Sequence, residues 1–419
     1  MSQSWDILDH ISNDDSFARA VKNIAVFAFA NGHTIFQRRS LTKALKAVPH
    51  LRSFQWFGLS PYLTWDIAEA LSIHCRGLSD LRLPRAMCLP AYLPITLSGL
   101  QRLRSLSFVA IDNLDNGPSE AIDLHCPDNE GFLEVAEFIT ANISTLRTLV
   151  LPGNEIWNLP VRVFSSLTEL DIVGSYELSG LDLIFHHAVH LQSLIIQAEE
   201  DVELFTVLQN NSSALPSLTS LKIISFVGHT EDHLRAVRAF IQGRSLLRRL
   251  DLNLNPINWA TFASILPAIS DLRGLKALGM TMTLAISTKE YTHLAQHFPK
   301  ELEAIRLRVD LSDPVLDHGP LSVIMDKLRQ MPSLAFFSLH RYGASKLYAF
   351  ADDIASDCQH LSLLYLDRDI WNVDRSESEI RLLPWSIRRK VLKIKEDFEN
   401  DDAEWLLRHG EFPPFFPPP

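Results

Sequence analysis

Two short stretches carry histidines at a spacing suited to binding a metal ion. In "HTEDH", His229 and His233 stand four residues apart, which would place both rings on one face of a helix. The stretch lacks the H-E-x-x-H order of zinc proteases, and no third ligand is evident beside it. Thr230 followed by Glu231 and Asp232 is more typical of a helix N-terminus, where a hydroxyl caps the first turn and carboxylates complement the helix dipole. We therefore interpret the histidine pair as structural.

Other candidate chemistry is equally sparse. "HHAVH" (His186, His187 and His190) falls between two predicted strands and is interpreted as a half-exposed helix face. The basic run "RRKVLKIK" (388–395) could serve nuclear import or anion binding, but the acidic run after it favours a solvated surface. The sequence contains no phosphate-binding loop, no GxGxxG after a strand and no GxSxG. We expect neither an enzyme nor a metal or cofactor site.

Composition narrows the class of protein. The chain has 419 residues, of which 47% are hydrophobic, so it can bury a large core. Its net charge of −11 disfavours nucleic acid and anionic membranes as partners. The four cysteines form no CxxC pair, which indicates free thiols in a reducing compartment. The N-terminus does not resemble a signal peptide, and no apolar run reaches the ~18 residues of a membrane span. We expect a cytoplasmic or nuclear protein.

A repeated spacing, Leu-x-x-Leu-x-Leu, organises the chain and is best preserved in "LLRRLDLNLNPIN" (246–258). Most copies begin 21 to 32 residues after the previous one, and a single step is 43 residues long. That period is typical of leucine-rich repeats. The thirteen copies begin at Val21, Leu51, Leu78, Leu103, Leu146, Leu167, Leu191, Leu218, Leu247, Leu275, Leu302, Leu334 and Leu361.

The repeat predicts the elements that position all other residues. Each x-Leu-x-Leu-x segment is a short strand whose leucines face inward, and stacked copies share one core. Helical periodicity follows between strands, as in "EDHLRAVRAFIQ", "WATFASILPAIS" and "PLSVIMDKLRQM". We therefore predict an α/β leucine-rich-repeat solenoid of about 13 irregular repeats. Its horseshoe would carry a parallel sheet on the concave face and helices on the convex face, and it resembles the ribonuclease-inhibitor-like class.

The amide that usually bonds the bend after each strand is mostly missing. Asn255 with Ile257, and Asn154 with Ile156, fit the full consensus, but other repeats have different residues there. Because a buried amide satisfies backbone groups at the bend, we expect irregular turns and a distorted horseshoe.

The side chains between the leucines would line the concave face. In the C-terminal half, small residues (Ala277, Gly279 and Thr281) predict a dip between polar and aromatic neighbours. Arginine and aromatic residues are enriched at binding hot spots, although scattered polar side chains are also ordinary on an exposed sheet. The candidate protein-binding residues are Arg249, Asp251, Asn253, Arg306, Arg308, Phe336, His340 and Tyr365.

The ends and one insertion depart from the repeat. We expect an N-terminal cap over 1–20, the repeat domain over 21–371, a C-terminal cap over 372–410 and an extended proline-rich tail over 411–419. Within the repeat domain, the acidic segment 112–131 is interpreted as a solvated insertion, with a projecting binding loop as the alternative.

Some segments resemble a known family. "SFARAVKNIAVFA", "LTKALKAVPHLRSFQWFG" and the late "WLLRHGEF" are similar to the repeat region of fungal F-box/leucine-rich-repeat-type proteins. The resemblance implies a substrate receptor of an SCF-type ubiquitin ligase, in which an F-box binds the Skp adaptor and the repeats hold the target. The stretch before Val21 has no counterpart of the F-box, neither its opening leucine-proline nor its helical run.

Two functions therefore stay open. The first is a non-catalytic protein–protein recognition module, in the form of a ubiquitin-ligase substrate receptor whose F-box is absent. The alternative is a leucine-rich-repeat scaffold, inhibitor or regulator unrelated to ubiquitination. Both predict a monomer that binds a protein on its concave face and binds neither nucleic acid nor membrane, while a Skp-type adaptor is a partner of the first alone.

Overall fold

A computed structural model describes most of the chain as two compact units. Unit 1 comprises Met1–Ser175 and Leu183–Leu191, and unit 2 comprises Tyr176–Asp182 and Gln192–Pro419. The described residues are 2–29, 34–60, 63–84, 97–109, 130–156, 158–175, 178, 180–198, 202–256, 258–310, 319–342, 347–367, 369–376, 379–386, 389–390, 393 and 395–409.

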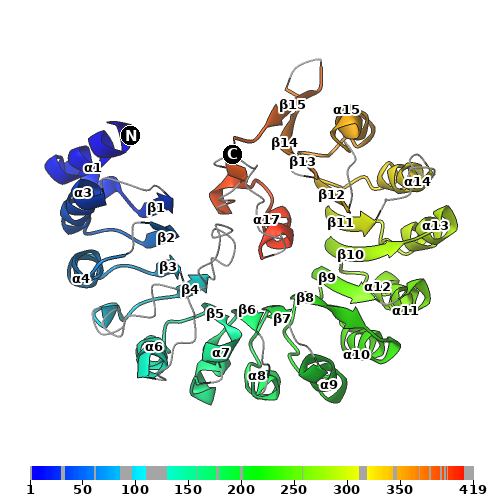
Figure 1. Ribbon diagram of the computed structural model, residues 1–419, viewed down its shortest axis with the longest axis horizontal. Coiled ribbons are helices and arrows are strands. Elements are labelled where there is room, and N and C mark those ends of the chain that lie inside the picture. Colours follow the sequence, from blue (N-terminus) through cyan, green and yellow to red (C-terminus); the bar gives the residue numbers. More distant parts are fainter. Residues whose placement is uncertain are drawn as a thin grey trace, which may run out of the picture. The chain divides into compact units, whose positions relative to one another are not determined.

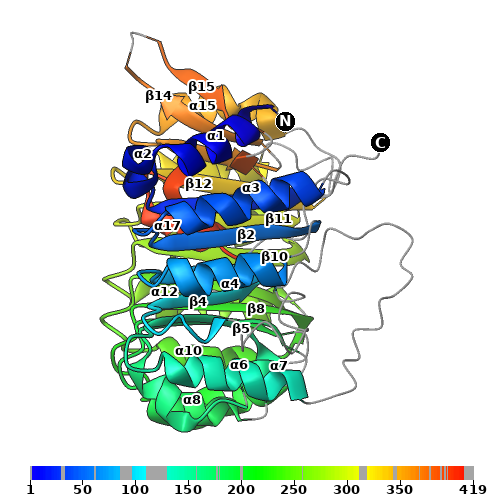
Figure 2. The ribbon, with the colours of Figure 1, turned by 90° about the vertical axis from the view of Figure 1, so that its left-hand side faces the viewer.

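Unit 1 alternates strands with helices after two N-terminal helices. Its strands pair in parallel and in chain order from β1 to β6. Figure 2 shows α1, α3 and α4 stacked side by side. The elements are α1 (Ser2–Asn13), α2 (Asp15–Ala20), β1 (Asn23–Phe29), α3 (Thr34–Ala47), β2 (Ser53–Ser60), α4 (Trp65–His74), β3 (Asp80–Pro84), β4 (Ser105–Val109), α6 (Glu130–Ala141), β5 (Thr148–Pro152), α7 (Gly153–Ile156), the 3-10 helix η2 (Val161–Ser166) and β6 (Glu169–Ser175).

Unit 2 continues the alternation and ends differently. Strands β7 to β13 pair in parallel, whereas β14 and β15 turn back as antiparallel neighbours. Its elements are β7 (Ser193–Ala198), α9 (Val202–Asn210), β8 (Ser220–His229), α10 (Glu231–Ile241), β9 (Arg249–Pro256), α11 (Trp259–Ala263), α12 (Leu266–Ser270), β10 (Ala277–Ala285), α13 (Thr288–Gln296), β11 (Ala304–Asp310), α14 (Gly319–Leu328), β12 (Phe336–Tyr342), η4 (Leu347–Phe350), α15 (Ala351–Asp357), β13 (Leu363–Leu366), β14 (Asp369–Asp374), β15 (Arg381–Pro384), η5 (Lys395–Asp397) and α17 (Asp401–Leu407). Helix α8 (Leu181–His187) lies where the chain passes between the units.

The leucine spacing explains this register. A strand lies within each of the thirteen copies, from β1 after Val21 to β13 after Leu361. In unit 2 the second residue of each strand from β7 to β13, which is the second apolar position of the Leu-x-x-Leu-x-Leu spacing, pairs along the sheet and is fully buried. These residues are Leu194, Leu221, Leu250, Leu278, Ile305, Phe337 and Leu364. Helices of unit 2 cover the face on which these side chains lie, and α17 lies against the opposite face (Figure 1). The mixed α/β fold with a mostly parallel sheet is consistent with a repeat solenoid.

Two local predictions concern the start of α10 and the helical segment 259–270. Thr230 caps α10, as expected, with its hydroxyl accepting the His233 N–H at 3.5 Å. The helical periodicity predicted over 259–270 is confirmed, although the segment forms two short helices, α11 and α12, in place of one continuous helix. Pro267 stands in the first turn of α12 and lacks the N–H that a continuous helix would need there.

The turns that lead into neighbouring strands are tied together by a buried arginine. Arg244 donates to the carbonyl oxygens of Ser212, Ala214 and Leu215 at 2.9, 2.6 and 3.0 Å, which ties the turn before β9 to the turn before β8. Burial lowers the pKa of Arg244 to about 10. Asn255 is half-buried at the end of β9, while Ile257 and the side chain of Asn154 lie outside the described residues.

Register shifts mark irregular turns within each unit. In unit 2 they fall between Ile224 and Gly228 and between Met282 and Ala285, and in unit 1 between Phe27 and Phe29. These irregularities agree with the expectation drawn from the missing asparagines. Most of the acidic segment 112–131 (residues 112–129) and the proline-rich tail 411–419 lie outside the described residues, so their predictions stay open. Residues 130 and 131 begin α6.

Candidate protein-binding face

The candidate residues lie on the face of unit 2 that its outer helices leave uncovered, which we call the inner face. Along this face, the third residues of strands β8 to β13 pair in the order Lys222, Asp251, Gly279, Arg306, Ser338 and Tyr365. The first residues of strands β7 to β13 pair in the order Ser193, Ser220, Arg249, Ala277, Ala304, Phe336 and Leu363. The period-two alternation of the strands thus brings residues from distant repeats into two neighbouring rows.

Most of the predicted binding residues are buried. Asp251, Arg306 and Phe336 have 0, 1 and 0% of their surface exposed, although the sequence placed them open to a partner. Asn253 and Arg308 are also buried, whereas Arg249, His340 and Tyr365 are half-buried. The segment that covers much of this face comes from the C-terminal end of the same chain. A binding role for these residues stays a prediction.

Helix α17 packs its apolar side into the predicted dip. Trp405, Leu406 and Leu407 are buried in one cluster with Ala277 and Ala304, and α17 contacts β10 and β11 (Figure 1). The small side chains at these strand positions leave room for the helix, because each would otherwise project toward it. Of the three small residues predicted to form the dip, Ala277 packs in the cluster with α17, whereas the space beside Gly279 is taken by the Asp251 carboxylate.

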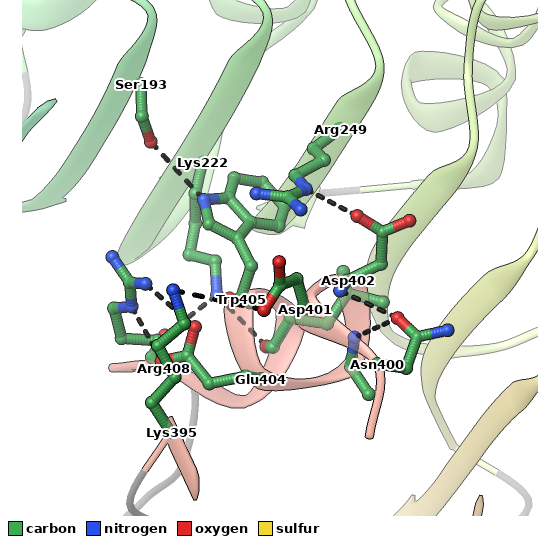
Figure 3. Close-up of polar contacts among 12 residues, drawn as sticks. Ser193, Lys222, Arg249, Lys395, Asn400, Asp401, Asp402, Glu404, Trp405 and Arg408 are labelled. Atoms are coloured by element: carbon green, nitrogen blue, oxygen red, sulfur yellow. Dashed lines mark hydrogen bonds and ion pairs between the residues drawn. The ribbon is translucent and has the colours of Figure 1, made fainter. Parts of the chain in front are cut away.

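The first turn of α17 is held by two polar contacts. The Asn400 side-chain oxygen accepts the backbone N–H groups of Asp402 and Ala403 at 2.7 and 3.2 Å, which caps the helix. The Asp402 carboxylate accepts the Arg249 Nε–H at 2.5 Å (Figure 3). Because the Asp402 side chain is only 8% exposed, this ion pair is poorly screened by water.

The last turn is held by one buried lysine. Lys222 Nζ donates to the carbonyl oxygens of Trp405, Leu406 and Arg408 at 2.6, 3.0 and 2.7 Å. It also lies 4.8 Å from the centre of the Trp405 ring, whose Nε1–H donates to Ser193 Oγ at 3.4 Å (Figure 3). An amine at a helix C-terminus bonds carbonyls that have no partner within the helix and complements the negative end of its dipole.

A buried ion network supports that lysine. Asp251 lies 3.2 Å from Lys222 Nζ and accepts the Arg306 Nη2–H at 2.7 Å. Arg306 reaches across β10 because Gly279 stands between them, and a Cβ on Gly279 would lie 2.2 Å from Asp251 Oδ1. Glycine is thus required by close approach rather than by backbone conformation.

The electrostatic consequences follow from burial and charge. Burial lowers the pKa of Lys222 to about 7, which Asp251 opposes and Arg306 and Arg408 reinforce. Burial by itself would raise the pKa of Asp251, but the positive charges of Arg306 and Lys222 hold it below its usual value. Burial, followed by the charge of Arg308, lowers the pKa of His340.

The segment before α17 is tied down by further contacts. Lys390 pairs with Asp369 at 2.6 Å, and Arg389 pairs with Asp397 at 3.2 Å. The Arg389 guanidinium also lies 4.1 Å from the centre of the Trp385 ring. Arg389 and Lys390 of the basic run "RRKVLKIK" therefore make intramolecular contacts. The range 372–410, expected as a C-terminal cap, contains the end of β14, all of β15 and α17, and its capping role stays a prediction.

The histidine stretches fall partly where the interpretation put them, since His190 of "HHAVH" lies in the turn after α8 and not on the helix. His229 is buried at the end of β8 against Phe205, and His233 lies in the first turn of α10. His186 and His187 lie at the exposed end of α8. Within the described part of the chain, no three His, Cys, Asp or Glu side chains are grouped so that they could hold a metal ion.

Sequence reasoning missed the residues that matter most on this face. Lys222 and Ser193 stand between the apolar positions of their repeats but were not among the candidate binding residues, and Trp405 fell within the expected C-terminal cap. The available signal was "DDAEWLL", whose acids followed by a large apolar group suit a helix that docks on a partly basic surface. Its docking partner could not be identified, because Lys222 and Trp405 are separated by 183 residues.

Comparisons with known proteins assign no family to this chain. No protein-family model matches the sequence, and no curated protein matches it. Among solved structures, the crystal structure of a Rad7 and Elc1 complex in yeast is similar at 12% identity and a TM-score of 0.48, covering 87% of this chain and 87% of that chain. Similarity at this level does not assign a function. In the part of the chain that the structure describes, no helix has the length and apolar character needed to cross a membrane.

Proposed function

We propose that this chain is a non-catalytic protein-recognition module whose inner face in unit 2 binds a segment of another protein. The observation that carries the proposal is the docking of α17, which buries Trp405 and Leu406 and engages Lys222 at the same time. Apolar contacts combined with directed charge contacts are typical of a surface that recognises a peptide or helix. The polar groups of this face bond one another and α17, which suits binding rather than chemistry on a small molecule.

A finer form of the proposal concerns the whole chain. The thirteen strand positions favour a leucine-rich-repeat horseshoe, and the resemblance to fungal F-box/leucine-rich-repeat-type proteins favours a ubiquitin-ligase substrate receptor in the cytoplasm or nucleus. That role depends on the sequence resemblance alone. Co-purification of the full chain with a Skp-type adaptor tests it, and a chain that never retains the adaptor would remove the ligase role while leaving protein recognition intact.

Proximity labelling in the source cell tests the recognition role itself. Arg249→Ala and Tyr365→Ala change half-buried inner-face residues, while Arg235→Ala changes an exposed arginine on the outer helix α10 and serves as the control. We expect the inner-face variants to lose specific neighbours that the wild-type and Arg235→Ala chains retain. Identical neighbours for all four proteins would refute the inner face as the binding surface.

A further inference from the structure

We propose that α17 is a built-in competitor that holds the inner face of unit 2 in place of a partner helix, and that the partner is an amphipathic helix carrying a carboxylate one turn before an aromatic residue. The inference rests on the proposed function and specifies it. It names the occupant of the site as a helix from another protein whose chemistry resembles that of α17.

The length of α17 is the first argument. It has seven residues, from Asp401 to Leu407, and isolated helices shorter than about 12 residues are marginal in water. Its helical structure therefore depends on the surface that holds it. When α17 leaves the inner face it should unfold, so that docking and folding are one event, as in segments that fold on binding.

The contacts of α17 define what the site recognises. Arg249 meets a carboxylate, Asp402, in the first turn. Ser193 and Lys222 meet the ring of an aromatic residue, Trp405, three positions later. Lys222 also bonds the carbonyls of the last turn, which any helix ending at this point would present. Two of the three requirements thus concern side chains, and the third concerns only where the helix ends.

Charge points to an acidic partner. Release of α17 would uncover a face on which Lys222, Arg249, Arg306 and Arg308 stand with Asp251 as the single acid among the candidate binding residues. Asp402 supplies the carboxylate that pairs with Arg249 when α17 is docked. A partner helix must supply the same charge, because release of α17 without a replacement would take this carboxylate away from Arg249.

Tethering explains why α17 is present in the resting chain. A segment joined to its site has an effective concentration in the millimolar range, so a modest intrinsic affinity keeps it docked. A free helix with the same contacts would lose this competition, whereas a longer helix that adds contacts would win it. The inner face would therefore accept only partners that bind more tightly than the chain's own segment.

A peptide-exchange experiment on the full chain tests this proposal. The probe is a fluorescein-labelled peptide of residues 398–409, and fluorescence anisotropy reports its binding. The receptors are the wild-type chain, a chain with α17 weakened by Asp402→Asn and Trp405→Ala, and a control with the exposed Leu246→Ala. We expect the weakened chain to bind the peptide at least tenfold more tightly than the wild-type and control chains do.

Two further variants fix the geometry. A peptide carrying Trp405→Ala should lose at least tenfold in affinity for the weakened chain, and adding Lys222→Met to the weakened chain should have a similar effect on the unmodified peptide. Hydrogen exchange over β8 to β11 establishes that each receptor keeps its folded sheet. Equal peptide affinity for the wild-type and weakened chains, or binding to neither folded receptor, would overturn the proposal.

The result separates this inference from the proposed function. If the peptide fails to bind while proximity labelling still depends on Arg249 and Tyr365, α17 is no competitor but the face remains a recognition surface. If the peptide replaces α17 on the inner face while no labelled neighbour depends on Arg249 or Tyr365, the recognition role fails, because α17 then competes with no other protein for this face. A concentration-dependent dimer of the wild-type chain by sedimentation would assign the site to a second copy and overturn the heterologous partner.

Discussion

Gly279→Ala should destabilise the inner face of unit 2 by forcing apart a buried ion pair. The added Cβ would lie 2.2 Å from Oδ1, 2.4 Å from Cγ and 3.0 Å from Cβ of Asp251. The carboxylate would have to turn away, although Oδ1 is the atom that accepts the Arg306 hydrogen bond at 2.7 Å. The substitution therefore breaks the pair without removing either charge.

The magnitude follows from that loss. Breaking one partnership of a buried pair costs about 3–5 kcal/mol. Replacing glycine by alanine returns about 0.4–1 kcal/mol, because the unfolded chain becomes less flexible. We expect a net loss of about 2–4 kcal/mol in the opening free energy of β9 to β11, measured by native-state hydrogen exchange, which resolves local units in a long repeat chain.

Two controls test whether the cost of Gly279→Ala comes from the clash with Asp251: the same substitution at another glycine, and Gly279→Ala in a chain that lacks the Asp251 carboxylate. Gly77→Ala is the control, because its Cβ would meet only the Leu51 carbonyl oxygen at 3.8 Å. In a chain that already carries Asp251→Ala, Gly279→Ala should cost less than about 1 kcal/mol, since the carboxylate is gone. An unchanged opening free energy for Gly279→Ala, or the same cost in both backgrounds, would refute the steric argument.

Other substitutions and pH probe the remaining contacts. Burial lowers the pKa of Lys222 to about 7, so the buried lysine holds its proton less tightly than an exposed one does, and release of α17 favours protonation. Docking should therefore weaken as the pH falls from 8.5 toward 7. Exchange of α17 amides at pH 8.5 and 7, corrected for intrinsic rates, measures this, and docking that strengthens on acidification would contradict it. Arg244→Met should lower the free energy of unfolding in urea by about 2–3 kcal/mol, because three bend carbonyls lose their donor, while the exposed Arg235→Met should cost under about 0.5 kcal/mol; equal costs would refute the role of the buried arginine. Asn400→Ala should cost about 1 kcal/mol of docking and speed α17 exchange about fivefold, whereas Ser287→Ala, which removes a cap from α13, should leave α17 exchange unchanged.

The repeat could be predicted because its information is local. Leu250 and Leu252 stand two residues apart in one strand, and the spacing within each repeat predicts that strand without information from the other repeats. Thr230 predicted the start of α10 for the same reason, since a cap depends on neighbours three residues away. Pro267 carried an equally local signal that the helix over 259–270 would divide, but the apolar spacing concealed it.

The occupant of the inner face could not be predicted, because it depends on contacts between distant segments. Asp251 and Arg306 were correctly placed in one row of side chains, yet nothing in their spacing indicates that α17 covers them. Gly279 was identified as part of a dip, but its need to be glycine arises only when Arg306 crosses β10 to reach Asp251. The register of the strands follows from the period of the repeat. Burial of the inner face depends instead on which other segments of the chain can reach it.

The antiparallel hairpin β14–β15 forms the last two strands of unit 2. A parallel strand array leaves at its end a row of unpaired backbone groups that a second copy could extend, which risks filament formation. In unit 2, β14 runs antiparallel to β13, and β15, antiparallel to β14, ends at Pro384, which has no N–H to offer an incoming strand. At this edge of unit 2, Pro384 therefore removes one of the hydrogen-bond donors that an added strand from another molecule would need.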